Sequence, residues 1–187
     1  MSMREHIILM AAYNKAMNTK LYAAAAQLAP QDLFGERQAF FGSLFATMNH
    51  LVVGDTIWLK RFSIHPAQHS ALGDIRARAA PTGLTTPMAT DLAGLHAMRQ
   101  QLDATICTWA AQLTEADLEQ VLCYANTRGV VSHKRFSSLV MHLFNHQTHH
   151  RGQATTLLSQ SGIDIGVTDL LMLIPNEGQD SAAAPQV

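Results

Sequence analysis

Four histidines within nine residues dominate the C-terminal part of the chain. They are His142, His146, His149 and His150, and they interrupt an otherwise apolar helical pattern that runs from Phe136 to Gln160. Histidines four positions apart on a helix lie one turn above each other, so their imidazoles can converge on one metal ion. The segment therefore predicts a long helix that carries candidate metal ligands.

Helical periodicity separates these histidines into two pairs. At about 100° per residue, His150 lies about 40° from the centre of the apolar stripe and His146 about 80°, whereas His142 and His149 lie about 120° and 140° away. We therefore expect His146 and His150 to face the interior edge of the helix and the other two to face outward. One interior histidine is more often a hydrogen-bonded core residue than a ligand, but two at ligand spacing leave both interpretations open. The stripe consists of Phe136, Leu139, Val140, Leu143, Phe144, Ala154, Leu157 and Leu158.

Composition narrows the classes of protein to which this chain can belong. Its 187 residues suit one domain, and a net charge of −1 without basic runs gives no footprint for nucleic acid. Cys107 and Cys123 are too few and too scattered for a disulfide framework or a thiolate zinc site, which favours a reducing compartment. The N-terminus lacks the order of a signal peptide, and the longest uncharged run, 38–54, is too short and too polar to span a bilayer. We expect a cytoplasmic protein with no nucleic-acid or membrane partner.

Capping and breaker residues divide the N-terminal half into two helices and a long connection. Ser2 and Glu5 have the form of a capping box, which begins a first helix that stops before Pro30. A second helix is expected from about Ala39 to Phe62. Proline and glycine residues then indicate an irregular connection over 63–85, with a short helical turn near its middle, and loops of this length are often functional covers.

The C-terminal half predicts two more helices with a hairpin between them. Thr86 and Pro87 resemble a helix start, and apolar residues follow at helical spacing to about Leu113. Two short β-prone runs, 121–124 and 129–131, flank a turn and indicate a small hairpin before the last helix. We therefore predict an all-α protein: an up-down four-helix bundle over residues 1–175, followed by a disordered tail over 176–187.

The second helix is apolar on two opposite faces, which bears on the quaternary structure. His50 lies in the narrower stripe, where a lone histidine is more often structural than functional. If His50 points into the bundle, the larger stripe needs cover from residues 167–174 or from a second subunit, because exposed apolar patches of that size are uncommon on monomers. We therefore expect a homodimer with twofold symmetry. The larger stripe includes Phe41, Leu44, Met48 and Leu51.

Three sequence blocks resemble the DinB/YfiT-like proteins, which are bacterial four-helix bundles. The blocks are the run from Gly42 to His50, the following Asp55 and Trp58-Leu, and the run His146-x-x-x-His150-Arg-Gly-Gln153. They occur in the right order, and the resemblance covers Met3 to about Leu173. In that family one histidine from the second helix and two from the last helix bind a divalent metal, often zinc or nickel. The resemblance therefore implies His50, His146 and His150 as ligands, and relatives often form dimers.

The resemblance also implies a range of activities. Three neutral imidazoles leave coordination positions open, which is typical of catalytic sites, and such an ion can lower the pKa of a bound water or thiol. Relatives include S-transferases that use a low-molecular-weight thiol and act on small electrophiles, and proteins described as metal-dependent hydrolases. The alternative is a non-catalytic, metal-stabilised dimeric stress or structural protein, in which a protein side chain closes the fourth position.

Two further residues are candidates for supporting the ligands. Asp55 could orient a ligand imidazole, but its direction differs from that of His50 by about 140° on an ideal helix, so a cap or an ion pair is an equal alternative. Gln153 is the second candidate for support of the ligands, and it could contact a substrate carboxylate or the bundle. Arg151 points about 160° away from Gln153 and is better interpreted as structural.

Overall fold

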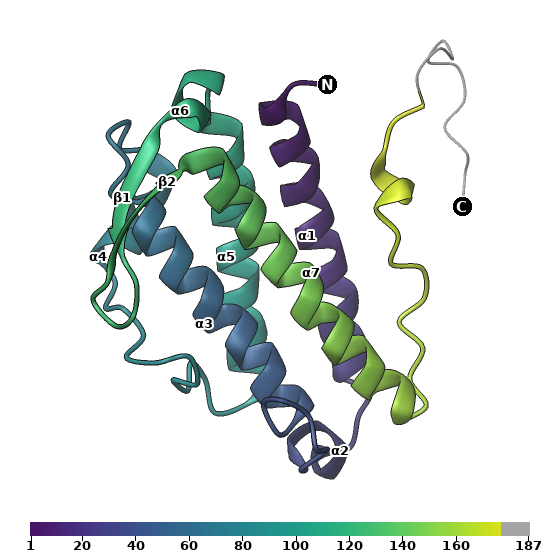
Figure 1. Cartoon of the computed structure of the whole chain (residues 1–187). Helices are drawn as coiled ribbons and strands as arrows, with labels where there is room; N and C mark the ends of the chain where they lie inside the picture. The colour runs from purple at the N-terminus through teal and green to yellow at the C-terminus, as the bar shows by residue number, and fades with distance from the viewer. Residues whose placement is uncertain (177–187) are drawn as a thin grey trace.

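Four long helices account for half of the residues in the computed structural model, which describes residues 1–176 (Figure 1). They are α1 (Met3–Ala25), α3 (Leu44–Phe62), α5 (Leu92–Gln112) and α7 (Phe136–Gln160). The shorter elements are the helices α2 (Pro30–Phe34), α4 (Gly73–Ala77) and α6 (Glu115–Glu119), the 3-10 turns η1 (Ser70–Leu72) and η2 (Leu170–Leu173), and the strands β1 (Val121–Ala125) and β2 (Val131–Arg135). The protein is thus mostly helical with a two-stranded antiparallel hairpin, as predicted. Of the predicted disordered tail, residues 177–187 lie outside the described residues.

Local capping chemistry decides where three of the four long helices begin. The capping box predicted at Ser2 and Glu5 is confirmed. The second long helix begins five residues later than predicted, because Gly42 adopts a positive φ of 82° and Ser43 then caps the helix by accepting from the Ala46 N–H. The third begins after Asp91 rather than at Thr86-Pro87, since the Asp91 carboxylate accepts the Gly94 N–H at 2.8 Å.

The directions of the helices correct the predicted up-down order. Near the start of α3, the Asn49 side chain donates to the Thr86 carbonyl just before α5, at 2.9 Å. At the other end of α3, Phe62 stacks on Trp109 near the end of α5, with ring centroids 5.2 Å apart. Helices α3 and α5 therefore run parallel, and strict alternation is wrong. The reason is the connection over 63–91, which returns the chain along the length of α3 before α5 begins (Figure 1).

Each long helix packs against two others and buries an apolar face. Helices α1 and α3 both contact α5 and α7, and the buried side chains form one continuous core. Leu44, Met48 and Leu51, from the larger stripe of α3, are at most 2% exposed within the single chain. The stripe is therefore covered within the single chain and does not require a second subunit, which was one of the two covers expected for it; the homodimer stays a prediction. Within the described part of the chain, no helix is long and apolar enough to cross a membrane.

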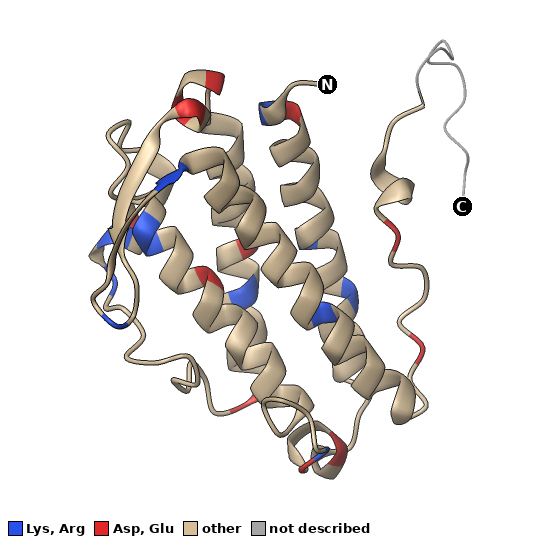
Figure 2. Ribbon diagram, in the orientation of Figure 1, with Lys and Arg blue, Asp and Glu red and all other residues tan. Residues whose placement is uncertain are grey.

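An ion cluster lies inside the helical core, and Figure 2 shows charged positions of both signs midway along the long helices. Arg99 is 1% exposed, and it donates to the Asp55 carboxylate at 2.6 Å and lies 3.0 Å from an oxygen of Asp103. Asn18 also donates to Asp103, at 2.9 Å. We call Arg99, Asp55 and Asp103 the Arg99 cluster. It joins α3 to α5, because one guanidinium is paired with two buried carboxylates.

Candidate metal centre

Helices α3 and α7 bring three histidines together at one point of their interface. His50 lies in the second turn of α3, and His146 and His150 lie one turn apart on α7. Each offers one ring nitrogen, and these atoms all lie within 4.8 Å of one another. The Nε2 atoms of His50 and His146 are 3.1 Å apart. We call this group the three-His site, and it is the group of candidate metal ligands found within residues 1–176.

Hydrogen bonds on the far side of two rings fix which nitrogen is free. Nδ1 of His50 lies 3.0 Å from the carbonyl oxygen of Leu84, and Nδ1 of His150 lies 2.7 Å from Oε1 of Gln153. Both oxygens can only accept, so each Nδ1 carries the proton and donates it. Each Nε2 is therefore left with a lone pair. Metal-binding histidines are commonly oriented in this way.

The closest pair of nitrogen atoms in this donor set has the spacing that a divalent ion requires. Two nitrogens that each bind one zinc ion at about 2.0–2.1 Å are themselves roughly 3–3.4 Å apart, which matches the 3.1 Å between His50 and His146. A proton on Nε2 of His146 could be donated only to the Nε2 lone pair of His50. A cation, by contrast, can accept a lone pair from each of the three rings at once. Nδ1 of His146 is buried and has no hydrogen-bond partner among the described residues, so its ring is held by packing.

Gly54 provides the space for that ring. It lies one turn after His50 on α3, and a Cβ added there would lie 2.7 Å from Cε1 of His146. A glycine inside a helix costs roughly 0.5–1 kcal/mol relative to alanine, so the close approach of the imidazole accounts for an otherwise unfavourable residue. Sequence reasoning missed Gly54, although a glycine four residues after a candidate ligand was a usable signal.

Burial keeps the imidazoles neutral at neutral pH. It lowers the pKa of His50 and of His150 below the usual value for histidine. Burial, followed by the proximity of the other histidines, lowers the pKa of His146 to about 3. Removal from water disfavours the charged form, and a neutral ring is the form that binds a metal ion. The site is therefore ready for a cation without first releasing protons.

The three-His site lies in a pocket of 440 Å³. The pocket is also lined by residues of α3 and of the hairpin turn, and by Leu84 of the connection over 63–91, whose carbonyl oxygen lies near His50. Phe41 covers one side, because its ring stacks on that of His50 at a centroid distance of 4.0 Å. Aromatic and apolar side chains thus surround a small number of polar nitrogen atoms, which is typical of small-molecule sites.

The two histidines predicted to face outward differ from each other. His142 and His149 are both exposed. His142 nevertheless lines the pocket and packs edge-on against Trp58 at 4.8 Å, so its outward direction does not remove it from the site. His149 does not line the pocket; its Nε2 atom lies 3.4 Å from the amide nitrogen of Gln153.

The candidate supporting residues also separate. Gln153 contacts His150, as described above. Asp55 is fully buried and pairs with Arg99, and no hydrogen bond within the described chain joins it to a histidine of the site. The ion-pair alternative therefore describes Asp55 better than an orienting role. Arg151 is buried away from the pocket, where it donates to Asn14 and to other side-chain oxygens, as the structural interpretation predicted.

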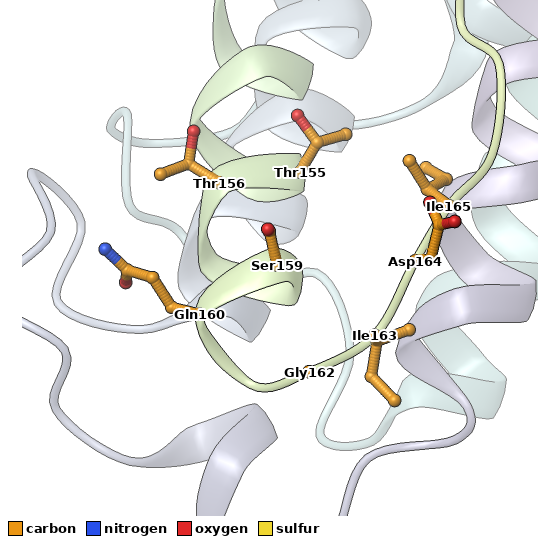
Figure 3. Close-up of a pocket in the computed structure, with 8 residues that line it drawn as sticks. All are labelled: Thr155, Thr156, Ser159, Gln160, Gly162, Ile163, Asp164 and Ile165. Carbon is orange, nitrogen blue, oxygen red and sulfur yellow. The ribbon is translucent and has the colours of Figure 1, made fainter.

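A larger hollow at the end of α7 offers less chemistry. It has a volume of 590 Å³ and is bounded by hydroxyl and aliphatic side chains of α7 and of the segment after it (Figure 3). Its one charged side chain is Asp164, which already accepts the N–H of Gly166 at 2.8 Å. Size alone would favour this hollow, but the convergent nitrogen atoms favour the three-His pocket.

The comparisons with known proteins agree with the motifs that surround this site. Protein DinB of Bacillus subtilis (strain 168) is 25% identical over 157 residues, which is 84% of this chain and 87% of that protein. No solved structure gives a significant match. The model of the DinB family matches residues 1–180, nearly the whole length. The chain therefore belongs to the DinB family.

Proposed function

We propose that the protein is a divalent-metal-dependent enzyme that activates a low-molecular-weight thiol or water at the three-His site. The observation that supports this most directly is the convergence of three neutral imidazoles in a pocket large enough for a small molecule. A metal ion held there would act as a Lewis acid and would lower the pKa of a thiol or water bound to it. The identity of the metal is proposed to be zinc or nickel, in line with the resemblance.

The chain's own residues account for how such a site is held and shielded. Leu84 and Gln153 hold the rings of His50 and His150 so that each presents Nε2. Phe41 and Trp58 exclude water from part of the pocket and leave apolar surface for a small electrophile. The described residues that line the pocket include no carboxylate that could act as a general base. We therefore propose no general base other than the water or thiol that a metal ion at the three-His site would activate.

The alternative, a non-catalytic metal-stabilised dimer, has less support. A closed structural site needs a fourth protein ligand, and within residues 1–176 the group of candidate ligands contains three residues. An accessible pocket bordered by the connection over 63–91 also favours an enzyme.

We propose in addition a four-helix bundle with one long crossover connection, a cytoplasmic location and a homodimer. Sedimentation equilibrium tests the dimer, which a mass that stays near 20.4 kDa at all concentrations would contradict.

Metal content is the first test of the site. Elemental analysis of the purified protein should find about one divalent ion per chain, and the His146→Ala variant should lose it. His149→Ala is the matched control, since His149 lies outside the pocket, and it should keep the ion. Stoichiometric metal in both variants would overturn the ligand assignment. A thiol-transfer and hydrolysis screen of the metal-loaded and metal-free protein then tests the activity.

A further inference from the structure

Arg61 lies where two hollows meet. It belongs to the last turn of α3 and borders both the three-His pocket and a second hollow of 350 Å³. The two hollows also share Ile57 and the hairpin-turn residues Asn126 and Thr127. They therefore form one groove, which extends from the three-His site past Arg61 toward Ile64.

The guanidinium of Arg61 lies against two aromatic rings. Its central carbon lies 4.6 Å from the ring centroid of Trp58 and 5.1 Å from that of Tyr124. Stacking of this kind uses the π surface of the guanidinium and leaves the N–H groups at its edge free to donate. No ion pair or hydrogen bond from the Arg61 side chain is found among residues 1–176, although the residue is half-buried.

The groove around Arg61 is positive and has no counter-charge. The described residues that line the two hollows include no aspartate or glutamate. The other cation, Lys60, is already engaged, because its ammonium donates to the backbone carbonyls of Ile75, Arg76 and Arg78. A fixed, partly desolvated guanidinium with a free edge matches a carboxylate, which can accept two parallel N–H bonds.

We propose that Arg61 is a specificity-determining residue, which binds the carboxylate of a small molecule whose thiol lies at the three-His site. The second half of this statement rests on the proposed function; the carboxylate contact does not. Along α3 the three-His site lies level with Gly54, against which His146 packs, and the Arg61 guanidinium lies over Trp58, four residues further on, or about 6 Å along the helix axis. The ligand class is therefore a thiol acid with several carbon atoms between its two ends. A carboxylate is favoured over a phosphate because one free cation balances one negative charge.

The test compares two thiols that differ in charge. Protein loaded with Co²⁺ is titrated with 6-mercaptohexanoate and with 6-mercapto-1-hexanol, and the thiolate-to-cobalt absorption band reports binding. The wild type should prefer the acid by about tenfold, as expected for a charge-assisted hydrogen bond. Arg61→Gln should abolish the preference without changing the affinity for the alcohol, and Arg61→Lys should keep part of it. Lys15→Gln removes an exposed cation on α1 and should behave like the wild type.

A second titration separates this inference from the metal site. Metal-free protein is titrated with hexanoate and 1-hexanol, followed by the fluorescence of Trp58, because the other tryptophan, Trp109, is fully buried. A fluorescence change on adding hexanoate that is lost in Arg61→Gln supports the carboxylate contact, whether or not cobalt binds. A failure of cobalt to bind would count against the proposed function alone. Equal affinities for acid and alcohol, or a preference that survives in a folded Arg61→Gln protein, would overturn the inference. If inorganic phosphate displaces hexanoate when phosphate is the less concentrated of the two, phosphate binds more tightly, and the choice of a carboxylate is overturned.

Discussion

Two polar clusters each include one residue of α3, His50 in one and Asp55 in the other, which are five positions apart. They differ in whether their polar groups are paired within the protein. In the Arg99 cluster the charges are paired inside the protein, and Arg151 adds a second cation through Asn18, which contacts both Arg151 and Asp103. In the three-His site, by contrast, three rings present nitrogen atoms to one point, and no protein group satisfies all of them. A cluster in which opposite charges are paired joins helices of the fold, whereas one whose nitrogen lone pairs are held in place without a shared partner is suited to a ligand.

The largest expected effect is on the stability of the charge-paired Arg99 cluster. Arg99→Met would leave Asp55 and Asp103 buried without their cation, and removing one partner of a buried ion pair costs about 3–5 kcal/mol. Urea unfolding followed by circular dichroism measures the free energy of unfolding. A loss below about 1 kcal/mol would place the cluster in the same class as a surface ion pair and would remove the contrast.

The second effect should separate metal affinity from stability. Gly54→Ala places a Cβ 2.7 Å from Cε1 of His146, so the ring must move and metal affinity should fall by at least about tenfold. The free energy of unfolding should change little, because the gain in helix propensity of up to about 1 kcal/mol offsets the crowding. Competition with a chromogenic chelator measures the affinity.

Gly152→Ala is the matched control for that variant. Gly152 lies in α7, and nothing lies within 4 Å of a Cβ added there. This change should stabilise the protein by about 0.5–1 kcal/mol and leave metal affinity unchanged. An equal loss of metal in both variants would mean that helix stiffness, and not the space beside His146, controls the site.

A smaller loss is expected when an orienting contact is removed. Gln153→Leu deletes the acceptor for Nδ1–H of His150 at 2.7 Å, so either ring nitrogen can carry the proton, and metal affinity should fall by roughly 10-fold to 100-fold. Gln153→Glu keeps an acceptor and should retain most of the affinity. Affinity that is unchanged in Gln153→Leu would show that packing alone orients His150.

The smallest expected effect is the loss of metal as the pH is lowered. Because the pKa of each site histidine is lowered by burial, the rings stay neutral below the usual histidine value of about 6.5, and protons compete with the metal only at lower pH. Between that value and the lowered pKa values the unfolded chain binds more protons than the folded one, so the stability of the metal-free protein falls as pH falls. Metal retention after dialysis should therefore hold at pH 6 and decrease below it. A midpoint above about pH 6.5 would contradict the lowered pKa values, and full retention at pH 3 would contradict an all-histidine site.

The parts of the molecule that sequence predicted are those decided within one segment. The capping box at Ser2 depends on neighbouring residues and is confirmed, and α7 likewise ends locally, where Gly162 follows the cap residue Ser161 with a positive φ of 76°. Periodicity along α7 likewise ranked His146 and His150 as the interior pair. The existence of the hairpin followed from turn residues between two short β-prone runs, although its second strand is Val131–Arg135 and not the predicted run 129–131.

The parts that sequence missed depend on contacts between distant segments. The partner of Asp55 is Arg99, on a different helix, and angles along α3 carry no information about it. The role of Gly54 appears only when His146 packs against it. His142 points outward from its own helix, but Trp58 of α3 and the hairpin turn extend the pocket to it. The parallel direction of α3 and α5 follows from the path of an irregular connection, which has no periodicity to analyse.

The connection over 63–91 is a segment whose sequence can change independently of the four long helices. Asn49 binds the connection at both Thr86 and Met88, so the segment is attached to α3 beside the site rather than at its far end. Between its ends it contributes the carbonyl of Leu84, which holds His50. Loops tolerate changes in length better than helices do. Changes in the sequence of this segment can therefore adjust the position of one ligand and the rim of the pocket while the four long helices stay the same, which makes it the natural place to redesign selectivity.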